Sequence, residues 1–236
     1  MIAIKSQEFA KLLHQSIERG EYRETGKLPT EEELIASYGV TRYCVRGAVG
    51  QLVSLGELYP VQGSGMYVRE SKREGCLSIS GTPGLTADLG EDRLRTEAKS
   101  IELVGATGDL AKRMKCAEGT EVYQLLRLRY VDERPFDLEY SWYLKSIVRY
   151  LNREIAEGSI YRYLREDVGI AIAFSDKILR TEKLDASDAK LLELPEGDPA
   201  LIVEDDAYTS NGQLFNASRN LYDWRRAKFF TLSQTK

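Results

Sequence analysis

Two arginines that could bind an anion stand two residues apart in the extended run EVYQLLRLRYV, residues 121–131. Residues two apart on a strand share a face, so Arg127 and Arg129 should point the same way. Two guanidinium groups side by side repel each other unless an anion joins them, and a ligand phosphate or carboxylate would serve. Glu139, in the following run FDLEYSWYL, could equally neutralise one of them. From the residues alone, the ion pair with Glu139 is favoured over a bound ligand.

Ser159 is a further candidate for anion binding, because it opens the helical run SIYRYL and can cap that helix. A helix N-terminus with a hydroxyl group can hold an anion, although this observation is weak when it stands alone.

A second basic group lies near the N-terminus of the chain. The stretch from Tyr38 to Gln51 carries Arg42 and Arg46 and no acidic residue, whereas acids gather from Glu18 to Glu33. The chain as a whole has a formal charge of −4, so binding to nucleic acid would have to use a local patch. The stretch predicts a small positive face.

The sequence contains little that supports catalysis or metal binding. The one histidine, His14, lies in a helical pattern with apolar neighbours, and the three cysteines, Cys44, Cys76 and Cys116, form no CxxC pair. We therefore expect reduced, structural cysteines, no metal site, no cofactor and no enzymatic activity. No apolar run is long enough for a membrane span, and the N-terminus lacks the features of a secretory signal, so the expected location is the cytoplasm.

Three helices are predicted to position the basic stretch. Ser6 is expected to cap the first, which runs to about Arg19. Thr30 and Glu33 form the T-x-x-E pattern of a capping box, which starts a second helix that should end at Gly39.

The third helix is expected to begin after Thr41 as its N-cap, with Val45, Ala48, Val49 and Leu52 as one apolar face. Two short helices joined by a glycine turn, the second with cations in its first turn, form the geometry that enters a DNA major groove. The runs ELYPVQ and GMYVRE then alternate around residues 63–65, which predicts a two-stranded hairpin serving as the wing of a winged helix-turn-helix.

The run GKLPTEEELIASYGVTRYCVRGAVGQLVSLGELYPVQGSGMYV resembles the N-terminal DNA-binding domain of GntR-type bacterial transcription regulators, over about residues 6–69. The resemblance implies contacts of Thr30 and Glu31 near the DNA backbone, phosphate and guanine contacts from the start of the third helix, and a wing near the minor groove. The implied DNA-binding residues are Thr30, Glu31, Thr41, Arg42, Tyr43, Arg46, Gly63 and Gly65.

Two features depart from that family pattern. Cys44 stands where a hydroxyl residue is common, so the phosphate contact of the family is not carried over to this position. Gly47 and Gly50 each cost the recognition helix up to about 1 kcal/mol relative to alanine, so we expect that helix to be fully ordered only on DNA.

The chain is predicted to have three parts: residues 1–70 as the DNA-binding domain, 71–84 as a linker rich in Ser, Gly and charge, and 85–236 as an α+β domain with an antiparallel sheet. Two hairpins are expected in the last part, and Asn211-Gly212 marks the second. Short helices are expected at about residues 147–157, 159–166 and 186–192.

Residues from about 85 to 232 resemble the UTRA effector domain of the HutC branch of GntR regulators, in LTAD, RLRYVDERPFDLEYSWY, GSIYRYL, LELPEGDPALIVEDDAYTSNGQLFNASRNLY and KFF. The resemblance implies a fold similar to chorismate lyase, a homodimer, and a small-molecule effector. The implied ligand residues are Thr86, Arg127, Arg129, Glu139, Ser159, Tyr161, Asn216 and Tyr222. A glutamate is common where this chain has Asn216, so the ligand is expected to differ from an amino-sugar phosphate.

Three classes of function follow. The first is a ligand-responsive regulator, most often a repressor, whose homodimer binds double-stranded operator DNA, with a sugar phosphate as first choice of effector and a carboxylated or amino-acid-related metabolite as second. The second is a chorismate-lyase-like enzyme, but the sequence shows no nucleophile–base pair that would support catalysis. The third is an RNA-binding or scaffolding protein, but the sequence shows no aromatic stacking motifs typical of RNA-binding modules.

Overall fold

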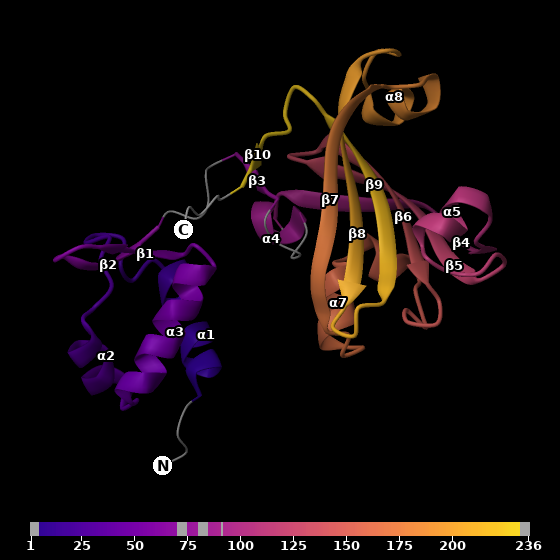
Figure 1. Cartoon of the computed structure of the whole chain (residues 1–236). Coiled ribbons are helices and arrows are strands. Elements are labelled where there is room, and N and C mark those ends of the chain that lie inside the picture. Colours follow the sequence, from indigo (N-terminus) through magenta and orange to yellow (C-terminus); the bar gives the residue numbers. More distant parts are fainter. Residues whose placement is uncertain (1–4, 70–74, 80–84, 91, 232–236) are drawn as a thin grey trace. The chain divides into compact units, whose positions relative to one another are not determined.

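The computed structural model describes residues 5–69, 75–79, 85–90 and 92–231, without the side chains of residues 87 and 88. They fall into two compact units, an N-terminal unit within residues 1–74 and a C-terminal unit from Gly75 to Thr231 (Figure 1). Among the described residues, no helix is long and apolar enough to cross a membrane.

The N-terminal unit is a winged helix-turn-helix, as predicted. Its core is a single apolar cluster in which Phe9, Leu13, Leu34, Val45 and Leu52 are almost completely buried. Three helices and a hairpin surround this cluster: α1 (Ser6–Glu18), α2 (Glu31–Tyr38), α3 (Arg42–Ser54), β1 (Leu58–Val61) and β2 (Gly65–Val68).

Local capping sets the ends of α2 and α3. The Oγ1 of Thr30 accepts from the backbone N–H of Glu33 at 3.3 Å, and a Glu33 carboxylate oxygen accepts from the backbone N–H of Thr30 at 2.7 Å. Gly39 ends α2 with a φ of +63°, a conformation that glycine adopts without strain. The Oγ1 of Thr41 accepts from the backbone N–H of Cys44 at 3.2 Å and caps α3. These three predictions are confirmed.

The predicted cap of α1 is wrong, because the helix begins one residue earlier than expected. Lys5 is the N-cap and Ser6 is the first helical residue. A Cβ atom placed on Gly47 would lie 2.7 Å from the Ser6 Oγ and 2.9 Å from its Cβ, so the two helices approach too closely there for alanine. Gly47 is thus a packing residue within α3, which runs from Arg42 to Ser54.

We expect opposite effects from two glycine-to-alanine changes in α3. Gly47→Ala should give no net gain or destabilise the protein, because the clash with Ser6 offsets the better helix propensity. Gly50→Ala, with nothing within 4 Å of the new Cβ, should stabilise it by up to about 1 kcal/mol. Urea denaturation followed by circular dichroism at 222 nm measures both. If both variants were equally stabilised, α1 and α3 would not pack as closely as described.

The C-terminal unit is built on a six-stranded antiparallel sheet, which confirms the α+β prediction. In spatial order its strands are β4 (Leu94–Gly105), β5 (Glu121–Val131), β6 (Arg134–Leu144), β9 (Leu214–Asp223), β8 (Pro199–Thr209) and β7 (Ile172–Lys183). The hairpin predicted at Asn211-Gly212 joins β8 to β9, and Gly212 has a φ of +81°.

Helices cover both faces of this sheet. On one face, α5 (Gly108–Arg113) and α8 (Ala186–Leu192) pack on separate apolar clusters. On the other face, α6 (Arg153–Glu157) and α7 (Ile160–Glu166) pack at one end. The opposite end of that face is covered by α4 (Leu85–Leu89). We call the face with α4, α6 and α7 the inner face.

The predicted linker differs from the structure at its described residues. β3 (Leu77–Ser78) pairs in parallel with β10 (Phe229–Phe230), so these residues belong to the C-terminal unit. The backbone N–H of Leu77 donates to the carbonyl of Lys228 at 2.7 Å, and that of Ile79 donates to the carbonyl of Phe230 at 3.0 Å. The buried side chain of Leu77 anchors this pair, whereas residues 71–74 and 80–84 lie outside the described residues.

Candidate functional site

A polar cavity of about 120 Å³ lies on the inner face of the C-terminal unit. All eight residues predicted as ligand residues line it, from α4, β5, β6, the start of α7 and β9. They are Thr86, Arg127, Arg129, Glu139, Ser159, Tyr161, Asn216 and Tyr222. The structure brings them together, and their roles in binding stay predictions.

The register of the sheet explains why the charged residues meet. Arg127 on β5 is directly opposite Glu139 on β6, and Arg129 is opposite Asp137. Alternate residues on each strand point to the same face, so all four side chains lie on the inner face of the sheet. All four are buried.

The two guanidinium groups are paired with carboxylates of the protein. An Nη atom of Arg127 lies 2.6 Å from Glu139, and an Nη atom of Arg129 lies 3.0 Å from the same carboxylate. The Nε of Arg129 also donates to Asp137, and its Nη2 donates to Asn220 at 2.9 Å. The ion pair with Glu139, which the residues alone favoured, is therefore present, and two carboxylates balance two arginines.

Burial and pairing shift the two carboxyl groups differently. Burial raises the pKa of Asp137 to about 6, although the neighbouring Arg129 opposes the shift. Burial also raises the pKa of Glu139, but Arg127 and Arg129 together outweigh it, so that pKa lies below its usual value. Glu139 is thus ionised at neutral pH, and Asp137 is the group of this cluster that titrates nearest to neutrality.

One donor of the arginine pair has no partner among the residues that the structure describes. Arg127 donates from Nη1 to the carbonyl of Ala156 at 3.0 Å and from Nη2 to Glu139, but its buried Nε bonds to nothing among the described residues. Most buried polar atoms in proteins are hydrogen-bonded. The Arg127 Nε is therefore a donor suited to an oxygen atom of a ligand.

The hydroxyl residues are held by their own contacts. The Oγ of Ser159 accepts from the backbone N–H of Arg162 at 3.3 Å, so Ser159 caps α7 as predicted. The hydroxyl of Tyr161 donates to the Asn216 Oδ1 at 2.9 Å, and the Asn216 amide donates to the carbonyl of Trp142 at 3.1 Å. The amide that replaces the usual glutamate thus fixes Tyr161.

Sequence reasoning missed further polar residues that also line the cavity, among them Lys177, Asp205, Ser218 and Asn220. Lys177 lies on β7, a strand that no clear hydrophobic pattern in the sequence indicates. Asp205 interrupts the otherwise apolar inner face of the run ALIVEDDAYT, and that interruption was the available signal.

The second candidate site is a groove of about 760 Å³ in the N-terminal unit, formed by the start of α2, by α3 and by the wing. The predicted DNA-binding residues that line it are Thr30, Glu31, Arg42, Arg46, Gly63 and Gly65. Thr41 and Tyr43 are not in its lining. Tyr43 projects from α3 with 84% of its surface exposed, and Thr41 is also exposed.

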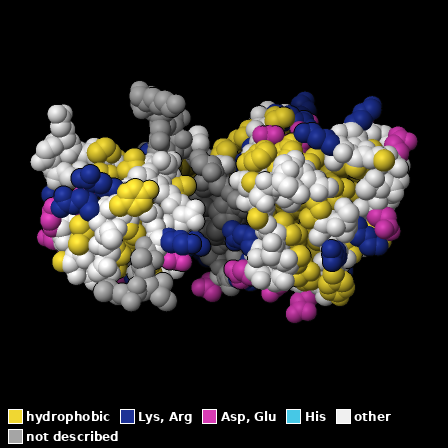
Figure 2. All heavy atoms as spheres, turned by 60° about the horizontal axis from the view of Figure 1, so that its bottom comes forward, with side chains coloured by type: hydrophobic (Ala, Val, Ile, Leu, Met, Phe, Trp, Pro, Cys, Tyr) yellow, Lys and Arg dark blue, Asp and Glu magenta, His cyan; other side chains and the backbone are white. Residues whose placement is uncertain are grey.

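The expected positive face is partly neutralised by acids from α2. The Nε of Arg46 donates to Glu31 at 2.9 Å, and the Nη2 of Arg42 donates to Glu32 at 3.0 Å. In Figure 2, basic side chains in dark blue lie beside acidic ones in magenta on the N-terminal unit. Exposed pairs of this kind stabilise little, so a phosphate or a base edge can replace the carboxylates.

The wing and the recognition helix fit the predicted geometry in two further respects. Gly63 has a φ of +73° and Gly65 a φ of +121°, and residues with a Cβ atom rarely adopt such backbone conformations. Cys44 is buried in the core of the unit, so it faces away from the surface that would meet DNA.

A winged helix-turn-helix and a sheet unit with a polar cavity, present in one chain, define a DNA-binding regulator with a small-molecule domain. Residues 5–68 match the family described as bacterial regulatory proteins, gntR family, and residues 91–228 match the UTRA domain. The chain belongs to the gntR family and carries a UTRA domain, in agreement with both resemblances. It is a transcription regulator and not an enzyme.

Similar proteins span nearly the whole chain. The uncharacterized HTH-type transcriptional regulator YydK of Bacillus subtilis (strain 168) is 31% identical over 96% of each chain. Its crystal structure has a TM-score of 0.84 at 30% identity, over 98% of this chain and 100% of that chain. The HTH-type transcriptional repressor NagR of the same organism is 26% identical, over 92% of this chain and 89% of its own. The mannosyl-D-glycerate transport/metabolism system repressor MngR of Escherichia coli (strain K12) is 27% identical, over 97% and 95%.

Proposed function

We propose that this protein is a cytoplasmic repressor whose homodimer binds a near-palindromic operator, and that a small anionic sugar derivative, with a sugar phosphate first, modulates this binding. Two similar proteins, NagR and MngR, are named repressors. A two-fold dimer would present two copies of α3 to repeated half-sites. Light scattering of the purified protein should give twice the mass of the chain.

The arginine pair beside the cavity, Arg127 and Arg129, is the observation that supports an anionic effector. Arg127 keeps an unpartnered N–H there, and hydroxyl groups of Ser159, Tyr161 and Tyr222 line the same space. An anion next to two guanidinium groups gains charge-assisted hydrogen bonds. The cavity, at about 120 Å³, lies below the roughly 300 Å³ at which drug-sized pockets begin, which favours a ligand no larger than a monosaccharide phosphate.

A carboxylated metabolite is the second candidate for the effector. MngR is named after mannosyl-D-glycerate, a glycoside that itself bears a carboxylate. Arginine forms bidentate hydrogen bonds with a carboxylate as it does with a phosphate, so the geometry of the arginine pair is compatible with either anion.

A thermal-shift screen of the whole protein tests the proposal. We expect a sugar phosphate to raise the unfolding midpoint, because a ligand that binds only the native state stabilises it by mass action. In Arg127→Ala the same ligand should give no shift, measured against that variant's own midpoint. A shift with carboxylates or uncharged sugars alone would replace the sugar-phosphate proposal, and a shift that persists in Arg127→Ala would remove Arg127 from the site.

A further inference from the structure

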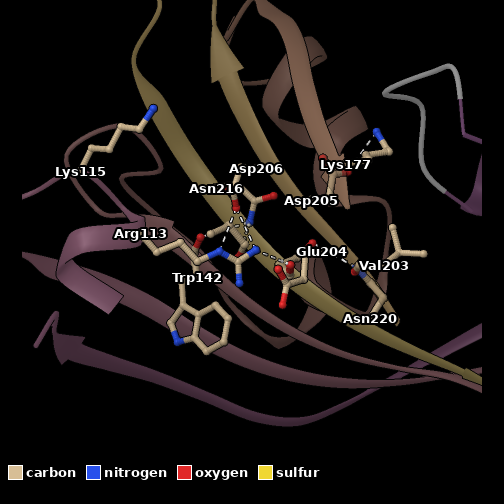
Figure 3. Close-up of polar contacts among 12 residues, drawn as sticks. Arg113, Lys115, Trp142, Lys177, Val203, Glu204, Asp205, Asp206, Asn216 and Asn220 are labelled. Atoms are coloured by element: carbon tan, nitrogen blue, oxygen red, sulfur yellow. Dashed lines mark hydrogen bonds and ion pairs between the residues drawn. The ribbon is translucent and has the colours of Figure 1, made fainter. Parts of the chain in front are cut away.

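A second polar pair faces the same cavity from strands β7 and β8, at the other edge of the inner face. Lys177 on β7 is directly opposite Asp205 on β8, and both side chains line the cavity with only 16% of their surface exposed. Their N···O distance is 3.2 Å. Figure 3 shows this pair near Val203 and Asn220.

Only one of the two oxygen atoms of the Asp205 carboxylate has a partner among the described residues. One of its oxygens pairs with Lys177, whereas Oδ1 is buried and accepts no hydrogen bond from any described residue. Leaving a buried acceptor without a donor is costly, so a donor from a bound molecule would be favourable. Burial raises the pKa of Asp205, although the charge of Lys177 and hydrogen bonds from Ser175 and Lys177 oppose the shift.

The next residue along the strand provides a contrast. Asp206 points to the opposite face of the sheet, where Arg113 of α5 donates to it from Nε at 3.0 Å and from Nη2 at 2.8 Å (Figure 3). Asp206 does not line the cavity and is held by the protein itself. Of the two adjacent carboxylates, Asp205 is therefore the one with capacity for a ligand.

The spacing of the strands suits a ligand that reaches both polar groups. Arg127 and Asp205 lie on the first and last strands of the order β5, β6, β9, β8. The register places Arg127 level with Val203, two residues from Asp205 along β8. Three strand spacings and two residues along the strand separate the two backbones by about 16 Å, and the arginine side chain extends into the space between them. The arginine pair supplies donors, and Asp205 supplies an acceptor for a group that carries a hydrogen.

We propose that Asp205, neutralised by Lys177, accepts hydrogen bonds from the hydroxyl groups of a sugar ring whose anionic group lies at Arg127 and Arg129. This inference rests on the proposed function and adds a sugar-selecting residue to the same cavity. Asn216 does not take this role, because its Oδ1 already accepts from Tyr161 and its amide donates to Trp142.

Titration calorimetry of the full chain tests the assignment with glucose 6-phosphate, glucosamine 6-phosphate, fructose 6-phosphate and inorganic phosphate as probes. In Asp205→Asn, we expect the Kd of each sugar phosphate bound by the wild type to rise at least about tenfold, as expected for loss of a charge-assisted hydrogen bond. The Kd of inorganic phosphate should change less than about twofold. Asp206→Asn is the matched control and should bind as the wild type does. The double variant Asp205→Asn/Lys177→Gln leaves neither charge unpaired and should show the same loss if the single variant folds poorly.

The outcomes separate the two proposals. Unchanged sugar-phosphate binding in both Asp205 variants, or an equal loss for inorganic phosphate, would overturn the role of Asp205 and leave the proposed function standing. Tighter binding of glucosamine 6-phosphate alone, with its loss in Asp205→Asn, would show that Asp205 selects an amino group, which contradicts hydroxyl recognition. A wild type that binds none of the probes would overturn the proposed function and this inference with it.

Discussion

Replacing Arg129 with methionine should destabilise the C-terminal unit by about 3 to 5 kcal/mol at neutral pH, because it leaves buried carboxylates without their counter-charge. Arg129 donates to Asp137 and lies 3.0 Å from Glu139, and all three groups are buried. Methionine fills much of the same volume, so lost packing contributes little. Urea denaturation followed by tryptophan fluorescence at pH 7.5 measures the loss, since both tryptophans, Trp142 and Trp224, lie in the C-terminal unit.

The loss in Arg129→Met should shrink on acidification. The pKa of Asp137 is already raised to about 6 in the folded protein, against 3.8 as its ordinary value. The folded state therefore holds this proton more tightly than the unfolded state, and the contribution of Asp137 to stability falls as the pH rises from about 4 through 6. Without Arg129 the pKa rises further, so protonation should relieve the variant already at pH 5.5.

Arg95→Met provides the matched control for that change. Arg95 is half exposed, pairs with Glu133 at 3.2 Å and lies over the Tyr130 ring. Its replacement should cost about 0 to 1 kcal/mol, with little dependence on pH. If Arg129→Met were as mild as Arg95→Met at pH 7.5, or equally unstable at both pH values, Arg129 would not hold the buried cluster together.

The second large effect is expected on DNA. Arg46→Ala should weaken operator binding about 5- to 150-fold, the range for losing an arginine that pairs with guanine. Arg46 lies on α3 beside the groove, 65% of its side chain is exposed, and its partner Glu31 can be displaced by DNA. Fluorescence anisotropy on a duplex selected from random sequences with the wild type measures the change.

Arg19→Ala is the control for this experiment, because it removes the same charge from the same unit. Arg19 pairs with Glu21 and is not part of the groove lining. Operator affinity should change little in Arg19→Ala. An Arg46→Ala protein that binds the selected duplex as tightly as Arg19→Ala would remove Arg46 from sequence recognition.

Much of the N-terminal unit could be predicted because its signals are local. The capping box of Thr30 and Glu33 and the left-handed Gly39 depend on residues close in the chain, and both are present. Two features depend on packing between helices and were missed. These are the contact of Gly47 with Ser6 and the pairing of Arg46 with Glu31, 15 residues apart in sequence.

In the C-terminal unit, the central strands carry an apolar pattern and the edge strands do not. β5, β6, β8 and β9 are largely buried and were predicted, whereas β4 and β7 form the edges of the sheet and contain almost no fully buried residues. Ile178 on β7 is 59% exposed, so β7 shows no clear division between apolar and polar faces.

In the cavity, likewise, only the contacts within one hairpin could be predicted from the sequence. Arg127, Arg129 and Glu139 come from two strands joined by a tight turn, so their meeting follows from the register of one hairpin. Asp205 and Lys177 reach the cavity only through the spatial order of the strands, which local sequence does not encode.

In the proposed regulator, a ligand in the cavity controls binding to DNA, and this control can be measured as operator affinity with and without ligand. We would measure anisotropy of the selected duplex with the wild type and Arg127→Ala, adding each sugar phosphate that gives a thermal shift. A coupling of roughly 1 to 3 kcal/mol should change wild-type affinity about 5- to 150-fold, with no change in Arg127→Ala. A ligand that binds the wild type without changing its operator affinity, or that changes the affinity of both proteins equally, would show that the cavity does not control DNA binding through Arg127.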